Sequence, residues 1–299
     1  LVNTGTLKIN NNLTINGLDK TTDLEAAPAS VVMGDITLTN ATLTNKDKGY
    51  KLKTEADKKE GEDDKTRVRV TYGKVTLNEG GDFVNNEGAL DSGSSLTITK
   101  DAGTAQINGT STWGTINAQK NDAVTVGNKG TLSADYLEYG MAAKNATIGD
   151  LVSVTEGGTF TVNKGLTVSS FAQGGSFGLS KAEYKYLASG ASLTFGKAQA
   201  FKQVDDAKDA INGQIDADGD YHQGNVTLSN YEAVWKEETA TSKTGTEGDA
   251  ETDKKGSWDV TKFGSVTVYN NARLTISNNK AEKADDLTKH GYSASLSLG

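Results

Sequence analysis

The chain has 299 residues, a formal net charge of -8, 34 Gly, one Pro and no Cys. Hydrophobic residues make up 35% of it, below the usual share in a compact globule, so we expect a thin, elongated core with few apolar side chains per layer. The acidic balance argues against nucleic acid and anionic membrane surfaces as partners. The lack of Cys excludes a disulfide scaffold, a thiolate zinc site and a cysteine nucleophile.

In chain order, the dominant pattern is a short strand in which two apolar residues flank a polar one, most often Thr. These triplets include Leu7-Lys8-Ile9, Leu13-Thr14-Ile15, Ile36-Thr37-Leu38, Val75-Thr76-Leu77, Leu96-Thr97-Ile98, Val124-Thr125-Val126, Phe160-Thr161-Val162, Leu166-Thr167-Val168, Val226-Thr227-Leu228, Val266-Thr267-Val268 and Leu274-Thr275-Ile276. Turns rich in Gly and Asn separate them. Each triplet predicts two inward side chains and one outward side chain.

Such closely spaced strands fit either a β-sandwich or a β-solenoid. The shortness of the strands, their recurrence over nearly the whole chain and the scarcity of Asn-Gly hairpin turns favour the solenoid. We therefore predict an all-β fold, a right-handed parallel β-helix (solenoid), as a single domain over residues 1–299. At about 20 to 25 residues per coil, it would have about ten coils. The handedness follows from the general preference of parallel crossovers.

Three segments interrupt the pattern. Residues 46–65 and 236–256 are rich in charge and predict solvated loops. Residues 179–213 predict a short helical insertion, because Ser180-Lys181-Ala182-Glu183 is a capping box and Gly190 can end the helix that follows. A second helix is expected over residues 197–212. Two functions are open for the charged segments: a binding or protease-sensitive loop, or a tolerated insertion.

A serine hydrolase is the first enzyme class to test. Asp91-Ser92-Gly93-Ser94 resembles the serine environment of trypsin-like autotransporter proteases, but Leu90 stands where a glycine is expected. The only histidines are His222 and His290, and nothing in the sequence brings them to Ser92 and Asp91 as a triad requires. We interpret this run as a turn that enters the Leu96 strand.

Polysaccharide lyases and glycosidases with the same type of fold are the second enzyme class. They need acidic residues, often with Arg or Lys, gathered in a groove. The chain has three Arg, and Arg67 and Arg69 alternate with Val68 and Val70 as an ordinary outward strand face would. We therefore predict no catalytic residues and no cofactor.

Asp216-Ala217-Asp218-Gly219-Asp220 is the strongest metal candidate, because alternating carboxylates can wrap Ca²⁺. An EF-hand loop would have Gly where Tyr221 stands and Glu where Thr227 stands. A solvated turn is therefore the preferred interpretation of Asp216, Asp218 and Asp220, and no metal site is predicted. The three tryptophans have two open roles, packing in the fold or exposed contact with a glycan or protein. They are Trp113, Trp235 and Trp258.

Three runs carry a family resemblance: Gly157-Gly158-Thr159-Phe160-Thr161-Val162, Gly165-Leu166-Thr167-Val168 and Asn271-Ala272-Arg273-Leu274-Thr275-Ile276. They resemble the passenger-domain repeats of bacterial autotransporters, over most of the chain outside the charged loops and the helical segment. The resemblance implies a right-handed β-helix exported through an outer-membrane barrel and then kept at, or released from, the cell surface. We expect this chain to be passenger only, without signal peptide or barrel.

The leading functional hypothesis is a bacterial adhesin at the cell surface or outside the cell, not an enzyme. A solenoid offers a long face of Thr, Asn and Ser that can make many weak contacts with a host or matrix protein, a glycan or a second copy. Virulence and biofilm formation are the settings in which such a surface would act. No apolar run is long enough to insert in a membrane. The alternatives are a polysaccharide-acting enzyme and a structural stalk.

Overall fold

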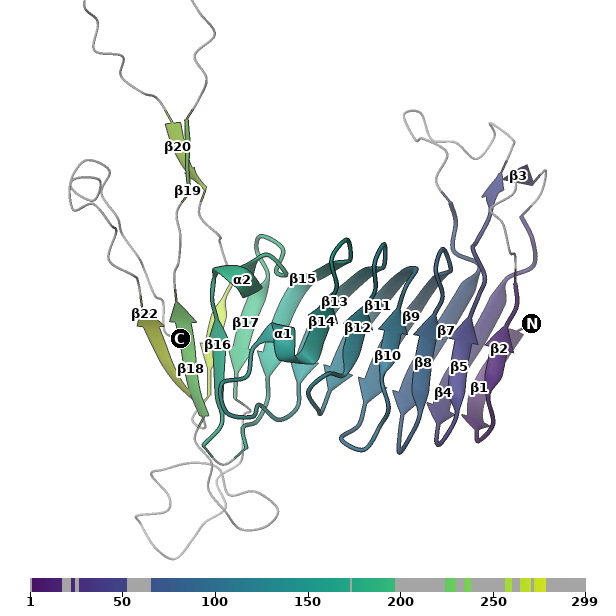
Figure 1. The fold of residues 1–299 in the computed structure, drawn as a ribbon, viewed down its shortest axis with the longest axis horizontal. Coiled ribbons are helices and arrows are strands. Elements are labelled where there is room, and N and C mark those ends of the chain that lie inside the picture. The colour runs from purple at the N-terminus through teal and green to yellow at the C-terminus, as the bar shows by residue number, and fades with distance from the viewer. Residues whose placement is uncertain are drawn as a thin grey trace, which may run out of the picture.

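The computed structural model describes residues 2–17, 23–24, 27–52, 66–172, 174–196, 224–229, 234–237, 256–259, 264–269 and 272–277. Strands stacked in parallel sheets form nearly all of the regular structure in these residues (Figure 1). The predicted all-β parallel solenoid is therefore confirmed.

The main sheet has nine parallel strands in the order β1-β4-β7-β9-β11-β13-β15-β17-β21. Their bounds are β1 (Val2–Ile9), β4 (Val31–Leu38), β7 (Val70–Leu77), β9 (Leu90–Ile98), β11 (Thr110–Ala118), β13 (Thr131–Tyr139), β15 (Thr159–Val168), β17 (Ser192–Phe195) and β21 (Val266–Val268). The spatial order follows the chain order, so each turn of the chain adds one strand beside the last. At about 4.8 Å per strand, the sheet extends for about 40 Å along the solenoid.

A second parallel sheet has six strands in the order β14-β12-β10-β8-β5-β2. Their bounds are β2 (Leu13–Ile15), β5 (Thr42–Asn45), β8 (Asp82–Asn85), β10 (Ala105–Ile107), β12 (Val124–Val126) and β14 (Val152–Val154). A third sheet pairs β16 (Ser176–Leu179), β18 (Gly224–Ser229) and β22 (Ala272–Ser277) in parallel. Two small pairs complete the set: β3 (Asp23–Leu24) with β6 (Lys51–Leu52), and the antiparallel β19 (Val234–Glu237) with β20 (Gly256–Asp259).

A coil of the solenoid has three short strand segments whose alternate side chains point inward: two halves of a main-sheet strand and one strand of the second sheet. In β4, Val31 and Met33 point inward, the alternation lapses for two residues, and Ile36 and Leu38 point inward again. The strand therefore bends in its middle, and β5 supplies the third side of the coil. The triplet Ile36-Thr37-Leu38 has the predicted two-in, one-out arrangement.

In β7 the bend lies at Gly73, where the preceding coil approaches closely. A Cβ built on Gly73 would lie 2.8 Å from the carbonyl carbon of Gly34 in the preceding coil. Side chains larger than hydrogen would push the two strands apart at this point. The paired residues Val75, Leu96, Ile116 and Leu137 advance by 21, 20 and 21 residues, within the predicted coil length.

The longer coils carry the helices. α2 (Lys181–Tyr184) begins at Ser180, the predicted cap residue, whose hydroxyl accepts a hydrogen bond from the backbone of Ala182 and donates to the Glu183 carboxylate in place of the predicted capping-box bonds. The helix is shorter than expected, because Leu187 pairs with Val162 as an isolated β-bridge and rejoins the solenoid before Gly190. α1 (Ile148–Leu151) was not predicted. The expected helix at 197–212 lies outside the described residues.

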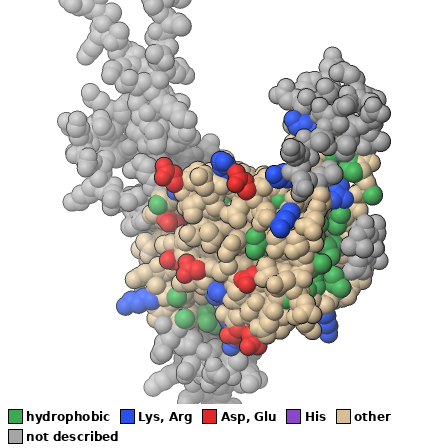
Figure 2. Space-filling model, turned by 45° about the vertical axis from the view of Figure 1, so that its right-hand side comes forward, with side chains coloured by type: hydrophobic (Ala, Val, Ile, Leu, Met, Phe, Trp, Pro, Cys, Tyr) green, Lys and Arg blue, Asp and Glu red, His purple; other side chains and the backbone are tan. Residues whose placement is uncertain are grey.

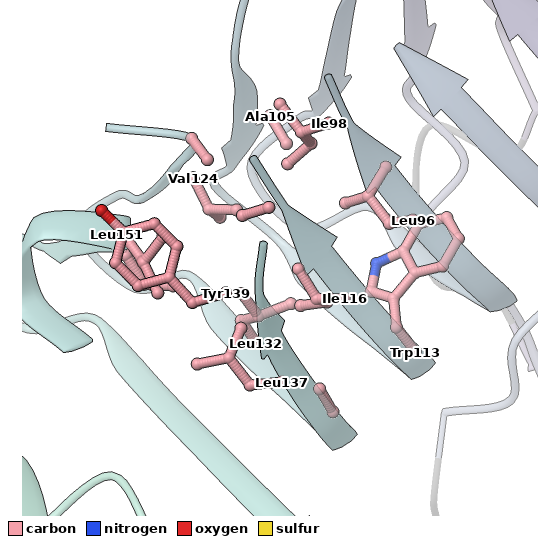
Figure 3. Packing of buried hydrophobic residues seen from close by; sticks show 14 of the residues in the cluster. Leu96, Ile98, Ala105, Trp113, Ile116, Val124, Leu132, Leu137, Tyr139 and Leu151 are labelled. Atoms are coloured by element: carbon pink, nitrogen blue, oxygen red, sulfur yellow. The ribbon is translucent and has the colours of Figure 1, made fainter. Parts of the chain in front are cut away.

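The core consists of in-register columns of side chains that run along the solenoid. One column joins every strand of the main sheet, and its residues are Leu7, Ile36, Val75, Leu96, Ile116, Leu137, Leu166, Leu193 and Val266. Figure 3 shows Leu96, Ile116 and Leu137 packed with residues of the second sheet such as Ala105 and Val124. Each coil thus buries its apolar side chains against those of its neighbours.

The neighbouring column alternates large and small residues. Tyr72, Gly93 and Trp113 occupy equivalent positions in three successive strands. The rings of Tyr72 and Trp113 stack with centroids 6.0 Å apart, and Phe83 meets both rings edge-on. A Cβ on Gly93 would lie 2.0 Å from Cζ3 of Trp113. Gly93 therefore makes room for the indole, and the packing role considered for Trp113 is confirmed.

Replacing Gly93 with Ala should overpack this column. We expect Gly93→Ala to lower the free energy of unfolding by about 1–3 kcal/mol, because the added methyl displaces the Trp113 ring. Gly178→Ala is the matched control, since no atom lies within 4 Å of a Cβ built there, and its effect should stay within about 0.5 kcal/mol. Denaturant unfolding followed by tryptophan fluorescence measures both. Equal midpoints for the two variants would contradict this packing.

Candidate functional site

The structure corrects the interpretation of Asp91-Ser92-Gly93-Ser94. The run is not a turn but the first half of the bent strand β9. Asp91 points inward and is fully buried, whereas the Ser92 hydroxyl points outward and contacts the hydroxyl of Thr71 at 3.5 Å. Neighbouring residues of a strand point to opposite faces, so Ser92 and Asp91 cannot act together on one substrate.

Several other candidates lie outside the described residues. They are Asp216, Asp218, Asp220, His222, His290 and most of the charged segments 46–65 and 236–256. Trp235 and Trp258 are backbone partners in the β19–β20 pair. In the part of the chain that is described, no group of three or more His, Asp or Glu is placed to hold a metal ion. The same residues include no helix of the length and apolarity that membrane crossing requires.

Asp91 is the centre of a polar cluster inside the solenoid. One carboxylate oxygen accepts hydrogen bonds from the side-chain amides of Asn45, at 3.0 Å, and Asn85, at 2.7 Å. The other accepts from the hydroxyl of Ser111, which in turn accepts from the indole N–H of Trp113 at 2.8 Å. These residues come from four strands, so the cluster links successive coils.

Burial raises the pKa of Asp91 above its ordinary value near 3.8. The hydrogen bonds from Ser111, Asn45 and Asn85 act in the opposite direction, since they stabilise the carboxylate. Burial also raises the pKa of Tyr72, and the nearby Asp91 and Asp47 add to that increase. The cluster therefore holds a buried carboxylate that three donors satisfy.

A second buried carboxylate corrects two predictions. Asp47 belongs to the segment expected to be a solvated loop, yet it is fully buried and accepts a hydrogen bond from Nε of Arg69 at 2.8 Å. The Nη2 atom of Arg69 bonds the same oxygen, and its Nη1 donates to the carbonyl of Ala29 at 3.0 Å. Arg69 is thus an internal ion-pair partner rather than an outward strand residue, and Val68 is the exposed one.

The two buried carboxylates have structural roles. A buried carboxylate needs a charged partner or hydrogen bonds: Asp47 has the ion pair with Arg69, and Asp91 has hydrogen bonds from neutral donors. Both are enclosed by the coils, so neither meets a substrate at the surface. The groups that can contact a ligand are therefore those on the outward faces of the coils.

The outward face of the main sheet carries columns of hydroxyl groups. Thr71, Ser92, Thr112, Ser133 and Thr161 are paired in register across five successive strands. A second column runs along all nine strands and contains Lys8, Thr37, Thr76, Thr97, Asn117, Glu138, Thr167, Thr194 and Thr267. Charged side chains of both signs are scattered over the side of the molecule seen in Figure 2, where uncharged polar groups and backbone predominate.

The register of this sheet shifts at two places, between β1 and β4 near Asn3 and Thr6, and between β13 and β15. Between β13 and β15 the pairing shifts, so that Asn163 and Lys164 together lie opposite Asp135 alone. Such a β-bulge redirects side chains and is common beside functional sites. The ammonium of Lys164 lies 2.7 Å from Asp135, and the amide of Asn163 donates to the hydroxyl of Ser133 at 3.1 Å. The exposed Tyr136 is the next residue along β13.

Comparison with models of known families, with curated proteins and with solved structures finds no match to this chain. The groups on the protein surface are therefore the grounds on which a function can be proposed.

The raised pKa of Asp91 predicts how stability changes with pH. A carboxyl with a higher pKa in the folded than in the unfolded chain contributes stability below its ordinary pKa, and this contribution is lost as the pH rises through the raised value. Relative to Asp91→Asn, the wild type should therefore gain free energy of unfolding as the pH falls from 7 towards 4. Denaturant unfolding at a series of pH values measures this difference.

Asp135→Asn is the control with the opposite sign, because its bond to Lys164 lowers the pKa of Asp135. The wild type should lose stability relative to this variant as the pH falls. A difference between wild type and Asp91→Asn that stays constant, or shrinks on acidification, would contradict the assigned environment of Asp91.

Proposed function

We propose that this chain is an adhesin-type passenger segment of a bacterial protein that is displayed on the cell surface or secreted. It binds host or matrix molecules, glycans or other cells through the outward face of its main sheet. The observation that supports this most is the alignment of hydroxyl groups on the outward side of the main sheet. One column runs from Thr71 to Thr161 on one half of the bent sheet, and a second, from Thr37 to Thr267 on the other half, is interrupted by Asn117 and Glu138.

The columns suit binding by many weak contacts. Hydroxyl groups donate and accept hydrogen bonds, so a regular array of them matches ligands rich in the same groups. The parallel coils hold these groups at fixed spacing, and a repetitive ligand can contact several strands at once. Because the array is already ordered, binding costs little conformational entropy.

The internal organisation supports the same proposal over an enzyme. Asp47 and Asp91, the fully buried carboxylates of the described core, are bonded to groups inside the coils, Asp47 to Arg69 and Asp91 to neutral donors. A polysaccharide-cleaving enzyme would instead need acidic groups in contact with the sugar. The absence of Cys and the resemblance to autotransporter passengers are consistent with export and display on the cell surface.

The proposal is tested by display of the full chain on an otherwise non-adherent bacterium, or on beads. We expect aggregation of the displaying cells, or capture on arrays of matrix proteins and glycans. Thr71→Lys combined with Thr112→Lys should reduce that binding at least about tenfold, because two bulky charges interrupt one exposed column.

The matched control places the same charges on the second sheet. Gln106 and Ser153 are exposed there, so Gln106→Lys combined with Ser153→Lys changes the net charge equally and should leave binding intact. Absence of both aggregation and capture would contradict the adhesin proposal. If the two double variants lose binding equally, either the binding surface lies elsewhere or the added positive charge alone causes the loss.

A further inference from the structure

Tyr136 is an aromatic side chain exposed on a face where polar and charged groups predominate. Its exposed fraction is 49%, whereas Tyr72 and Tyr139 of the same sheet are buried. Its partners in the adjacent strands are Thr115 on one side and Gly165 on the other. Single exposed apolar side chains are common on protein surfaces, so the groups around Tyr136 decide whether its ring can take a ligand.

The glycine partner leaves the ring room to lie on the sheet. A Cβ built on Gly165 would lie 3.3 Å from Cδ1 of Tyr136, a tight contact, and 3.5 Å from Cε1, an ordinary van der Waals contact. The ring therefore rests against the backbone of the next coil. Ser192 follows in the column beyond Gly165, so no large side chain borders the ring on this line.

The bulge brings hydrogen-bonding groups to Asp135, the residue that precedes the ring in β13. Asn163 and Lys164 are both exposed, and both contact Asp135, the residue before Tyr136, at 3.4 Å and 2.7 Å. These contacts fix the directions of an amide, a carboxylate and an ammonium group. The ammonium has three donors and its bond to Asp135 uses one of them. The charges of Lys164 and Asp135 compensate each other.

A flat aromatic surface bordered by fixed donors and acceptors fits a sugar ring. One face of a pyranose is lined by C–H groups that pack on an aromatic ring, while its hydroxyls bond amide and carboxylate groups at the rim. A phosphorylated or otherwise anionic ligand would meet a locally compensated charge and a chain of net charge -8. The chemistry therefore favours a neutral saccharide.

We propose that Tyr136, Asp135, Asn163 and Lys164 form a binding site for a neutral pyranose unit of a glycan. The ring of Tyr136 stacks on the C–H face of the sugar, and the bulge residues bond its hydroxyls. This proposal rests on the proposed adhesive function and names its ligand class and the position of the contact. The neighbouring Thr115 and Ser133 lie where further sugar units would extend along the hydroxyl columns.

The test uses the full chain on an array of neutral gluco-, manno- and galacto-oligosaccharides, together with matrix proteins and a second copy of the chain. Tyr136→Ala should weaken capture on the sugars at least about tenfold, because it removes the stacking surface. Tyr136→Phe keeps the ring and should retain most of the binding. Tyr269→Ala removes another exposed tyrosine of the described surface and should have no effect.

Loss in Tyr136→Ala alone, with circular dichroism unchanged, supports the site. Sugar binding that is equal in wild type and Tyr136→Ala overturns the site and leaves the adhesive function standing. Capture only by matrix proteins or by a second copy has the same consequence. If none of the three kinds of probe is bound, both the site and the adhesive function are overturned.

Discussion

The structure depends on one constraint, the parallel stacking of coils in register. Because every residue lies against its equivalent in the next coil, a side chain must suit the column as well as its own strand. In aliphatic columns such as Ile36, Val75 and Leu96, the side chains are similar in size and pack without a special neighbour. The column with Trp113 requires Gly93 beside it, and the buried Asp91 requires donors from neighbouring coils.

The same constraint governs the surface. Outward residues are aligned as strictly as inward ones, so a composition rich in Thr and Ser becomes ordered rows of hydroxyl groups. The register shifts at the β1–β4 pair and again at Asn163 and Lys164, and the exposed ring of Tyr136 lies beside the second shift. A repeated surface with one local specialisation can combine weak extended contact with a defined recognition point.

The strands, their inward faces and the start of α2 could be predicted from the sequence. Apolar-polar-apolar triplets such as Leu96-Thr97-Ile98 gave the strands and their inward faces, and the Ser180 cap gave the start of a helix. Register between coils is not a local property, so neither the partners of Asp91 and Arg69 nor the bulge beside Tyr136 could be found that way. Charged residues in a polar run suggested solvent exposure, although Asp47 is buried because Arg69 reaches it from the next coil.

In-register stacking can be tested by measuring the distance between labels on strands of different coils. The chain has no Cys, so spin labels can be attached only at introduced ones. Labels at Thr76→Cys and Thr194→Cys lie five strands apart in one column and should be separated by about 24 Å, whereas Thr97→Cys with Thr194→Cys should give about 19 Å. Pulsed dipolar spectroscopy should find this difference of one strand spacing, and equal or broadly scattered distances for the two pairs would contradict the solenoid register.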